Sequence, residues 1–124
     1  MTDLLRRARD STTQVSAVGR GSFSPYGQTL WPVSAQTRFM TSLARGCLLD
    51  RASTTYLLAL MNEVIPGQRW GFGTLPSVSA LKGGWGPDPD GGYLVRQMGL
   101  QPLGNAIVVF HHQYSHAADC APAG

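Results

Sequence analysis

One stretch in the middle of the chain decides the fold: Ala80-Leu81-Lys82-Gly83-Gly84-Trp85-Gly86-Pro87-Asp88-Pro89-Asp90-Gly91-Gly92-Tyr93-Leu94-Val95-Arg96-Gln97-Met98-Gly99. An apolar run reaches a lysine, gives way to glycine, proline and aspartate, and resumes as a second apolar run. The first run alternates loosely, with Val78 and Ala80 on one face, and residues 93–100 are compatible with a strand on both faces. Because glycine and proline between such runs favour a turn, the stretch predicts two antiparallel strands.

Two segments upstream have the three- and four-residue apolar spacing of helices. The first opens at Pro32-Val33-Ser34, where we expect Ser34 to be the N-cap and Gly46 to end the helix. Its expected apolar face comprises Phe39, Met40, Leu43 and Cys47. Cys47 is therefore expected to be a small core residue.

The second helix is expected to begin after Ser53 or Thr54 and to end at Pro66-Gly67. Its expected apolar face comprises Leu57, Leu60, Met61, Val64 and Ile65. Near the N-terminus, residues 4–8 have the pattern of a helix remnant.

The run from Ala106 to Phe110 is fully apolar and predicts a third strand. The sequence therefore predicts an α+β fold with two helices followed by a three-stranded antiparallel sheet. The 124 residues suffice for one domain, expected over residues 1–110. Residues 111–124 are polar and without period, which predicts a disordered tail.

Apolar residues make up 43% of the chain and charged residues 14%, a globular composition. The net charge of +3 is scattered, and only Arg6-Arg7-Ala8-Arg9 forms a cluster. Without a basic face interleaved with aromatics, this cluster indicates a solvated helix face and not a nucleic-acid surface. No apolar run is long enough to span a bilayer and no signal peptide pattern is visible, so we expect no membrane partner and a cytoplasmic location.

His111, His112, His116 and Cys120 are the only residues that suggest a metal, through soft donor atoms in one short tract. A His-rich tract is compositional evidence alone, and the segment has no helical apolar stripe. The glycines at 71, 73, 83, 84 and 86 do not form a phosphate-binding motif. We expect no cofactor and no metal.

Lys82 is the only lysine of the chain and precedes Gly83-Gly84, where a ligand could approach the backbone closely. Around it, residues 1–110 resemble the serine β-lactamase and penicillin-binding transpeptidase superfamily, and more narrowly the class-A-type serine hydrolases of high-GC bacteria. The resemblance rests on Thr29-Leu30-Trp31, on Leu60-Met61 through Val64-Ile65-Pro66-Gly67-Gln68-Arg69-Trp70-Gly71, on Lys82-Gly83-Gly84-Trp85, and on Gly92-Tyr93-Leu94-Val95-Arg96-Gln97-Met98-Gly99.

In that family a Lys-Thr/Ser-Gly motif lies on the strand that lines the active site. The resemblance places Lys82 at the lysine, Gly83 at the hydroxyl residue and Gly84 at the glycine. It implies that Lys82 attracts a substrate carboxylate and supports proton transfer, and that the backbone N–H of Trp85 contributes to the oxyanion hole. Arg96 on the next strand would add a fork for the carboxylate.

Three departures from the family pattern bear on activity. Gly83 lacks the hydroxyl that would hold the substrate carboxylate. The only Ser-x-x-Lys match is Ser79 with Lys82, which falls within a predicted strand and not at the start of a helix, and Ser-x-Asn is absent. Glu63, the sole glutamate, is expected to face outward. We therefore expect a partial β-lactamase-like hydrolase that lacks nucleophile and base and is inactive alone.

The resemblance implies a small amide, ester or β-lactam substrate only if another chain supplies the missing half. Relatives of this kind are often exported and include enzymes of antibiotic resistance. The polar end fits a gene fragment or an altered reading frame. The alternative is a non-catalytic interaction module, in which the apolar strand at Ala106–Phe110 pairs with a second copy or with a separately encoded N-terminal half.

Overall fold

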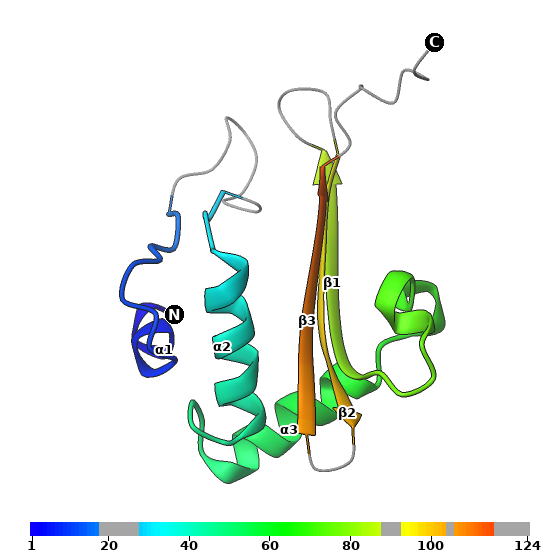
Figure 1. Cartoon of the computed structure of the whole chain (residues 1–124), viewed down its shortest axis with the longest axis horizontal. Helices are drawn as coiled ribbons and strands as arrows, with labels where there is room; N and C mark the ends of the chain where they lie inside the picture. The colour runs from blue at the N-terminus through cyan, green and yellow to red at the C-terminus, as the bar shows by residue number, and fades with distance from the viewer. Residues whose placement is uncertain (18–27, 88–92, 104–105, 116–124) are drawn as a thin grey trace.

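The computed structural model describes residues 1–17, 28–87, 93–103 and 106–115. These residues form the α+β fold that the sequence predicts (Figure 1). The helices are α1 (Thr2–Arg7), α2 (Val33–Ala44) and α3 (Arg51–Asn62), followed by the 3-10 turns η1 (Pro66–Gln68) and η2 (Gly71–Thr74) and the strands β1 (Ser79–Pro87), β2 (Tyr93–Leu103) and β3 (Ala106–Ser115). The expectation of two helices missed α1, which is a complete short helix and not a remnant.

The strands are antiparallel in the order β1-β2-β3, so each strand pairs with its neighbour in sequence. The register of β1 on β2 shifts between Ser79 and Lys82, where a bulge gives Ala80 a φ of 49°. Ala80 and Leu81 are both buried, but on different faces: Ala80 lies in the core cluster beneath the helices, whereas Leu81 lies against Gly73 of η2. Both faces of β1 are therefore covered at this point.

Strand β3 is longer than the sequence indicates. It continues through residues 111–115, which pair with β2 from Met98 to Leu94. The apolar pattern stops at Phe110, but the backbone ladder needs no apolar side chain to continue. The prediction of a disordered tail is therefore wrong for residues 111–115, and the rest of that tail lies outside the described residues.

Helix α2 begins two residues earlier than expected. Its N-cap is Pro32, whose fixed φ of −58° leads into the helix and whose carbonyl accepts the N–H of Gln36. Ser34 lies inside the helix and does not cap it, so that prediction was wrong. Gly46 has a φ of +71° just past the C-cap, as expected for a residue that ends a helix.

Helix α3 begins at Arg51 because the carboxylate of Asp50 accepts the N–H of Ser53 at 2.9 Å. The sequence placed this start three or four residues too late. The helix ends at Asn62, so Ile65 lies outside it, and both Ile65 and Leu60 are exposed, contrary to expectation. Leu57 and Met61 contact the core as expected, and Leu58 joins them.

The core lies where α2 and α3 meet one face of the sheet, and residues of the N-terminal segment join it from the other side of α2. Met40, Leu43, Leu48, Met61, Ala80 and Leu100 form a cluster that also includes Ala8. Figure 1 shows α1 on the far side of α2 from the sheet, and η1 and η2 on the opposite side of the sheet from α2. Cys47 is exposed in the turn after α2, so its expected role in the core was wrong.

Asp10 ties the segment after α1 to the segment before α2. Its carboxylate accepts the N–H of Thr13 at 2.9 Å, the N–H of Thr12 at 3.2 Å and the indole N–H of Trp31 at 3.2 Å. The Thr13 side chain and N–H, with the N–H groups of Thr12 and Trp31, lower the pKa of Asp10 to about 2. The residue is buried and ionised.

Within the described ranges, no helix has the length and apolar character needed to cross a membrane.

Candidate functional site

The residues expected to form the site divide between the two faces of β1 and β2. Opposite residues of an antiparallel pair share a face, so Lys82 lies with Met98 and Gly84 with Arg96, while Gly83 lies with Gln97. Met98 packs against the core cluster, and the side chain of Gln97 reaches η2. The first face is therefore turned to the helices and the second to the 3-10 turns.

Lys82 and Arg96 are brought together on the helix-facing side of the sheet. They are diagonal neighbours on adjacent strands, a position that puts their Cα atoms about 7–8 Å apart. Lys82 is exposed, and its Nζ donates to the carbonyl oxygen of Gly83. Two cations thus occupy one face, although the sequence left the register of Arg96 open.

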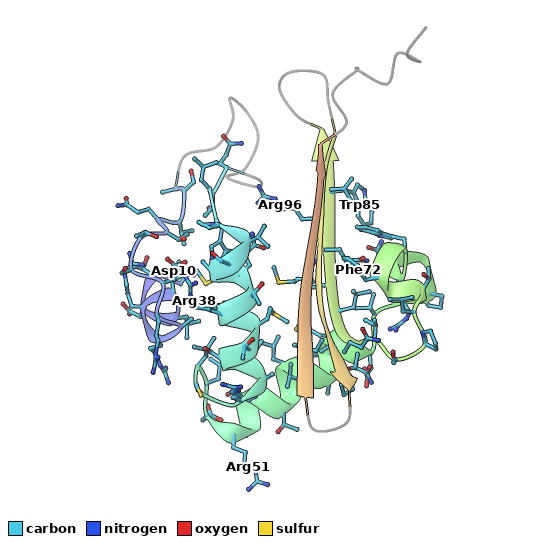
Figure 2. The ribbon with its side chains drawn as sticks, viewed as in Figure 1. Asp10, Arg38, Arg51, Phe72, Trp85 and Arg96 are labelled. Carbon is cyan, nitrogen blue, oxygen red and sulfur yellow. The ribbon has the colours of Figure 1, made fainter. Side chains whose placement is uncertain are left out.

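Arg96 points toward the segment that precedes α2 (Figure 2). It lines a cavity of about 270 Å³ with Leu30, Trp31 and Pro32. Its Nε is buried and has no hydrogen-bond acceptor within the described parts of the chain. A buried guanidinium N–H without an acceptor favours binding of an oxygen ligand in this cavity.

Trp70 covers Gly83 on the opposite face. A Cβ at position 83 would lie 3.0 Å from Cζ2 of Trp70, closer than ordinary contact. Trp70 also packs edge-to-face on Trp85, with ring centroids 6.0 Å apart. The two indoles line an apolar pocket of about 410 Å³ with Gly67, Gln68 and Val95. The indole of Trp70 thus explains why position 83 is glycine.

Gln97 holds the 3-10 turn against the sheet, a role that the sequence analysis missed. Its Oε1 accepts the N–H of Phe72 at 2.8 Å, and its Nε2 donates to the carbonyl of Trp70 at 2.6 Å. Gly71 between them has a φ of +53°, and a Cβ there would lie 2.7 Å from Oε1 of Gln97. No residue pattern in the sequence marks this role, because β2 also carries the polar residues Arg96 and Gln101.

Strand β1 lies at the edge of the sheet, with β2 on one side only. On its outer side, no backbone hydrogen bond joins β1 to another described segment. Alternate N–H groups of an edge strand point away from its partner and are free to bind a ligand. The segment Lys82–Trp85 therefore presents backbone donors as well as the lysine.

Ser79 does not have the surroundings of a nucleophile. Its hydroxyl donates to the carbonyl of Leu100 at 3.3 Å, and it lies at the bulge of β1 and not at the start of a helix. Glu63, at the C-cap of α3, is exposed. The described residues contain no set of three or more His, Cys, Asp or Glu side chains that could hold a metal. His111 and His112 lie in β3, whereas His116 and Cys120 are outside the described residues.

In comparisons with known proteins, this chain matches no family model, no curated protein and no solved structure.

Proposed function

We propose that this chain forms the carboxylate-binding wall of a β-lactamase-like serine hydrolase site and does not hydrolyse substrate by itself. The observation that supports this most is the placement of Lys82-Gly83-Gly84-Trp85 on an edge strand whose outer side is free among the described residues. An edge strand can offer its N–H groups to a substrate carbonyl, whereas a central strand uses them in the ladder.

The face of the sheet on which each side chain lies determines its proposed role. Lys82 and Arg96 share one face, so both can approach a single carboxylate of a bound substrate. The backbone N–H of Trp85 would supply one donor to the oxyanion. The substrate class is then a small amide or ester that carries a carboxylate, of which β-lactams are one kind.

Hydrolysis requires a nucleophile and a base in addition to this carboxylate-binding strand. Gly83 provides no hydroxyl, and Trp70 fills the space where one would stand. The hydroxyl of Ser79 donates to the carbonyl of Leu100 and to no side-chain base among the described residues. Binding and oxyanion donors alone give only a small residual rate. We therefore expect binding without turnover.

The test is a titration of the ¹⁵N-labelled chain with benzylpenicillin, followed by amide chemical shifts. We expect shifts at residues 82–85 and at Arg96, and weaker shifts with the penicillin methyl ester, which lacks the carboxylate. Lys82→Gln and Arg96→Gln should each weaken binding several-fold, because each removes a cation from the carboxylate site. Arg51→Gln is the matched control, since Arg51 is exposed at the start of α3 and points away from the sheet (Figure 2).

Equal amide shifts with benzylpenicillin and its methyl ester, or shifts confined to other elements, would contradict the proposal that this strand binds a carboxylate. Intact mass after the same incubation tests the second half of the proposal. We expect no acyl adduct, and a stoichiometric adduct on any serine would show that the chain carries a working nucleophile.

A second candidate function is an interaction module that pairs through β3. This strand has ten residues and pairs with β2 alone within the described part of the sheet. A long unprotected edge favours pairing with another chain, either a second copy or an N-terminal half encoded separately. Light scattering coupled to size exclusion tests the first of these, and a monomer at all concentrations would argue against self-pairing.

A further inference from the structure

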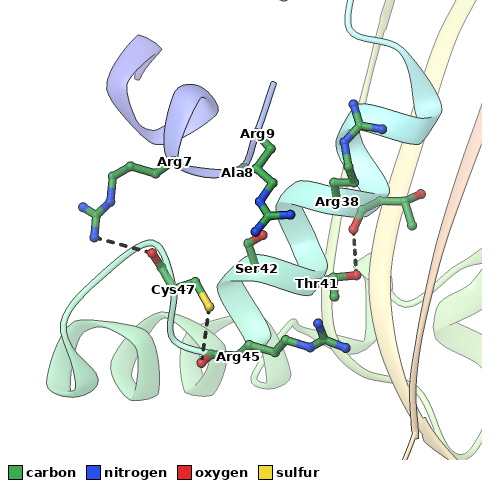
Figure 3. A pocket seen from close by; sticks show the side chains of 9 residues that line it. Arg7, Ala8, Arg9, Arg38, Thr41, Ser42, Arg45 and Cys47 are labelled. Atoms are coloured by element: carbon green, nitrogen blue, oxygen red, sulfur yellow. Dashed lines mark hydrogen bonds between the residues drawn. The ribbon is translucent and has the colours of Figure 1, made fainter. Parts of the chain in front are cut away.

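A cationic pocket lies between the end of α1 and the outer side of α2, away from the sheet (Figure 3). Its volume is about 410 Å³. It is lined by four of the ten basic residues of the chain, Arg7, Arg9, Arg38 and Arg45, and by Ala8, Thr37, Thr41, Ser42 and Cys47. This concentration of charge is independent of the site on β1.

The positive charge of this pocket is not neutralised by the surrounding protein. No aspartate or glutamate lines it among the described residues. Two acidic side chains next to the segments that form the pocket are already engaged, since Asp10 binds Thr12, Thr13 and Trp31, and Asp50 caps α3 through Ser53. Arg7 donates to the carbonyl of Cys47 at 3.5 Å, a neutral acceptor. Four guanidinium groups therefore repel one another and favour an anionic ligand.

The arginines come from two segments, and the hydroxyl residues Thr37, Thr41 and Ser42 line the same pocket. Arg7 and Arg9 reach from the end of α1, whereas Arg38 and Arg45 project from α2 (Figure 3). Arg38 and Arg45 are seven residues apart, so they lie on one stripe of the helix about 10 Å apart along its axis. Ser42 lies between them on this stripe and can donate a further hydrogen bond.

We propose that this pocket binds a small polyanion with two or more phosphate or carboxylate groups. The guanidinium fork matches both groups by paired hydrogen bonds. A ligand with one anionic group cannot bridge Arg38 and Arg45 across about two helical turns, whereas a ligand with several can. The volume is that of a small-molecule site and is too small for a folded partner.

Cys47 gives a direct readout of occupancy. Its thiol is exposed, lines the pocket and lies 3.9 Å from the carbonyl oxygen of Arg45. In a Cys120→Ser background it is the only thiol of the chain. A polyanion in the pocket blocks access of an alkylating reagent to this thiol. Ligand binding should therefore slow alkylation of Cys47.

The experiment measures the rate of Cys47 alkylation by iodoacetamide with increasing tripolyphosphate or citrate. We expect at least threefold protection by one of the two at millimolar concentration, little protection by chloride at equal ionic strength, and loss of protection in high salt. Arg38→Gln and Arg45→Gln should each raise the half-protecting concentration three- to tenfold. Arg51→Gln removes the same charge outside the pocket and should leave it unchanged.

Three results would overturn the proposal: no protection by either polyanion, equal protection by chloride, or an Arg51→Gln effect as large as that of Arg38→Gln. None of these depends on penicillin binding at Lys82. Failure here therefore leaves the proposal for β1 intact, and failure there leaves this one intact.

Discussion

Two buried polar side chains, Gln97 and Asp10, each join segments that are far apart in the sequence, but they do so with different chemistry. Gln97 connects β2 to η2 through two hydrogen bonds of a neutral amide. Asp10 connects the end of α1 to Trp31 through a carboxylate whose pKa is lowered to about 2. Both side chains are 1% exposed, so each is as fixed as a core residue.

The difference implies that the two candidate sites respond differently to conditions. The amide of Gln97 does not titrate, so the contact that supports Gly83 and Trp85 is independent of pH. Asp10 is the residue next to Arg9, which lines the cationic pocket. The hydrogen bonds that fix this side of the pocket therefore depend on the ionisation of the Asp10 carboxylate. The wall on β1 is therefore supported by a pH-independent contact and the pocket by a charged one.

The largest expected effect comes from Gln97→Leu. The change removes an acceptor from the N–H of Phe72 and a donor from the carbonyl of Trp70, both on a covered face of the sheet. Loss of two such bonds should lower the free energy of unfolding by about 2–4 kcal/mol. Urea unfolding followed by circular dichroism measures this as a lower midpoint.

Gln101→Leu is the matched control, because it changes the same residue type on the same strand. The Nε2 of Gln101 donates to the hydroxyl of Ser77 at 2.6 Å in an exposed position. Water can replace this bond, so we expect a change of less than about 0.5 kcal/mol. If both variants lost equal stability, the contact of Gln97 with η2 would not be the reason.

The sequence predicts the elements whose signals are local. Apolar alternation and glycine-rich turns place β2 close to its observed start, and Gly46 correctly ends α2. The bulge at Ala80 was not predicted, because it depends on how β1 meets β2 and not on any residue type that marks it. The start of α3 was missed although Asp50 followed by Ser53 is a recognisable cap signal.

Prediction of the sites was limited for the same reason. The motif at Lys82 is visible in the sequence, but the division of Lys82 and Gly83 between two faces with different neighbours requires the register. The cationic pocket brings Arg7 and Arg9, expected to be merely solvated, beside Arg38 and Arg45, which are about 30 to 40 residues away in the sequence. A contact between such distant segments has no local signature.

Gly83→Thr tests whether Trp70 excludes a hydroxyl residue from the wall. The new Cβ would stand 3.0 Å from the indole, so Trp70 must shift. We expect a loss of about 1–3 kcal/mol, as for other overpacked sites. Gly67→Ala is the control, because a Cβ there meets nothing within 4 Å. A Gly83→Thr variant as stable as the parent would show that Trp70 yields easily and that position 83 tolerates the family residue.

Asp10→Asn tests whether the charge of the Asp10 carboxylate makes stability depend on pH. The pKa of Asp10 is lowered from 3.8 to about 2 in the folded chain, so its contribution to stability is present above pH 4 and is lost as the pH falls toward 2. The variant should therefore be less stable than the parent at pH 6, and the difference should shrink by pH 2.5. Urea midpoints at both values measure this, with Asp3→Asn as the control on α1.

Some acid sensitivity should remain in the Asp10→Asn variant, because the N–H and hydroxyl of Ser53 also lower the pKa of Asp50. A difference between parent and variant that stayed constant from pH 6 to 2.5 would show that the carboxylate of Asp10 does not hold the N-terminal segment through its charge.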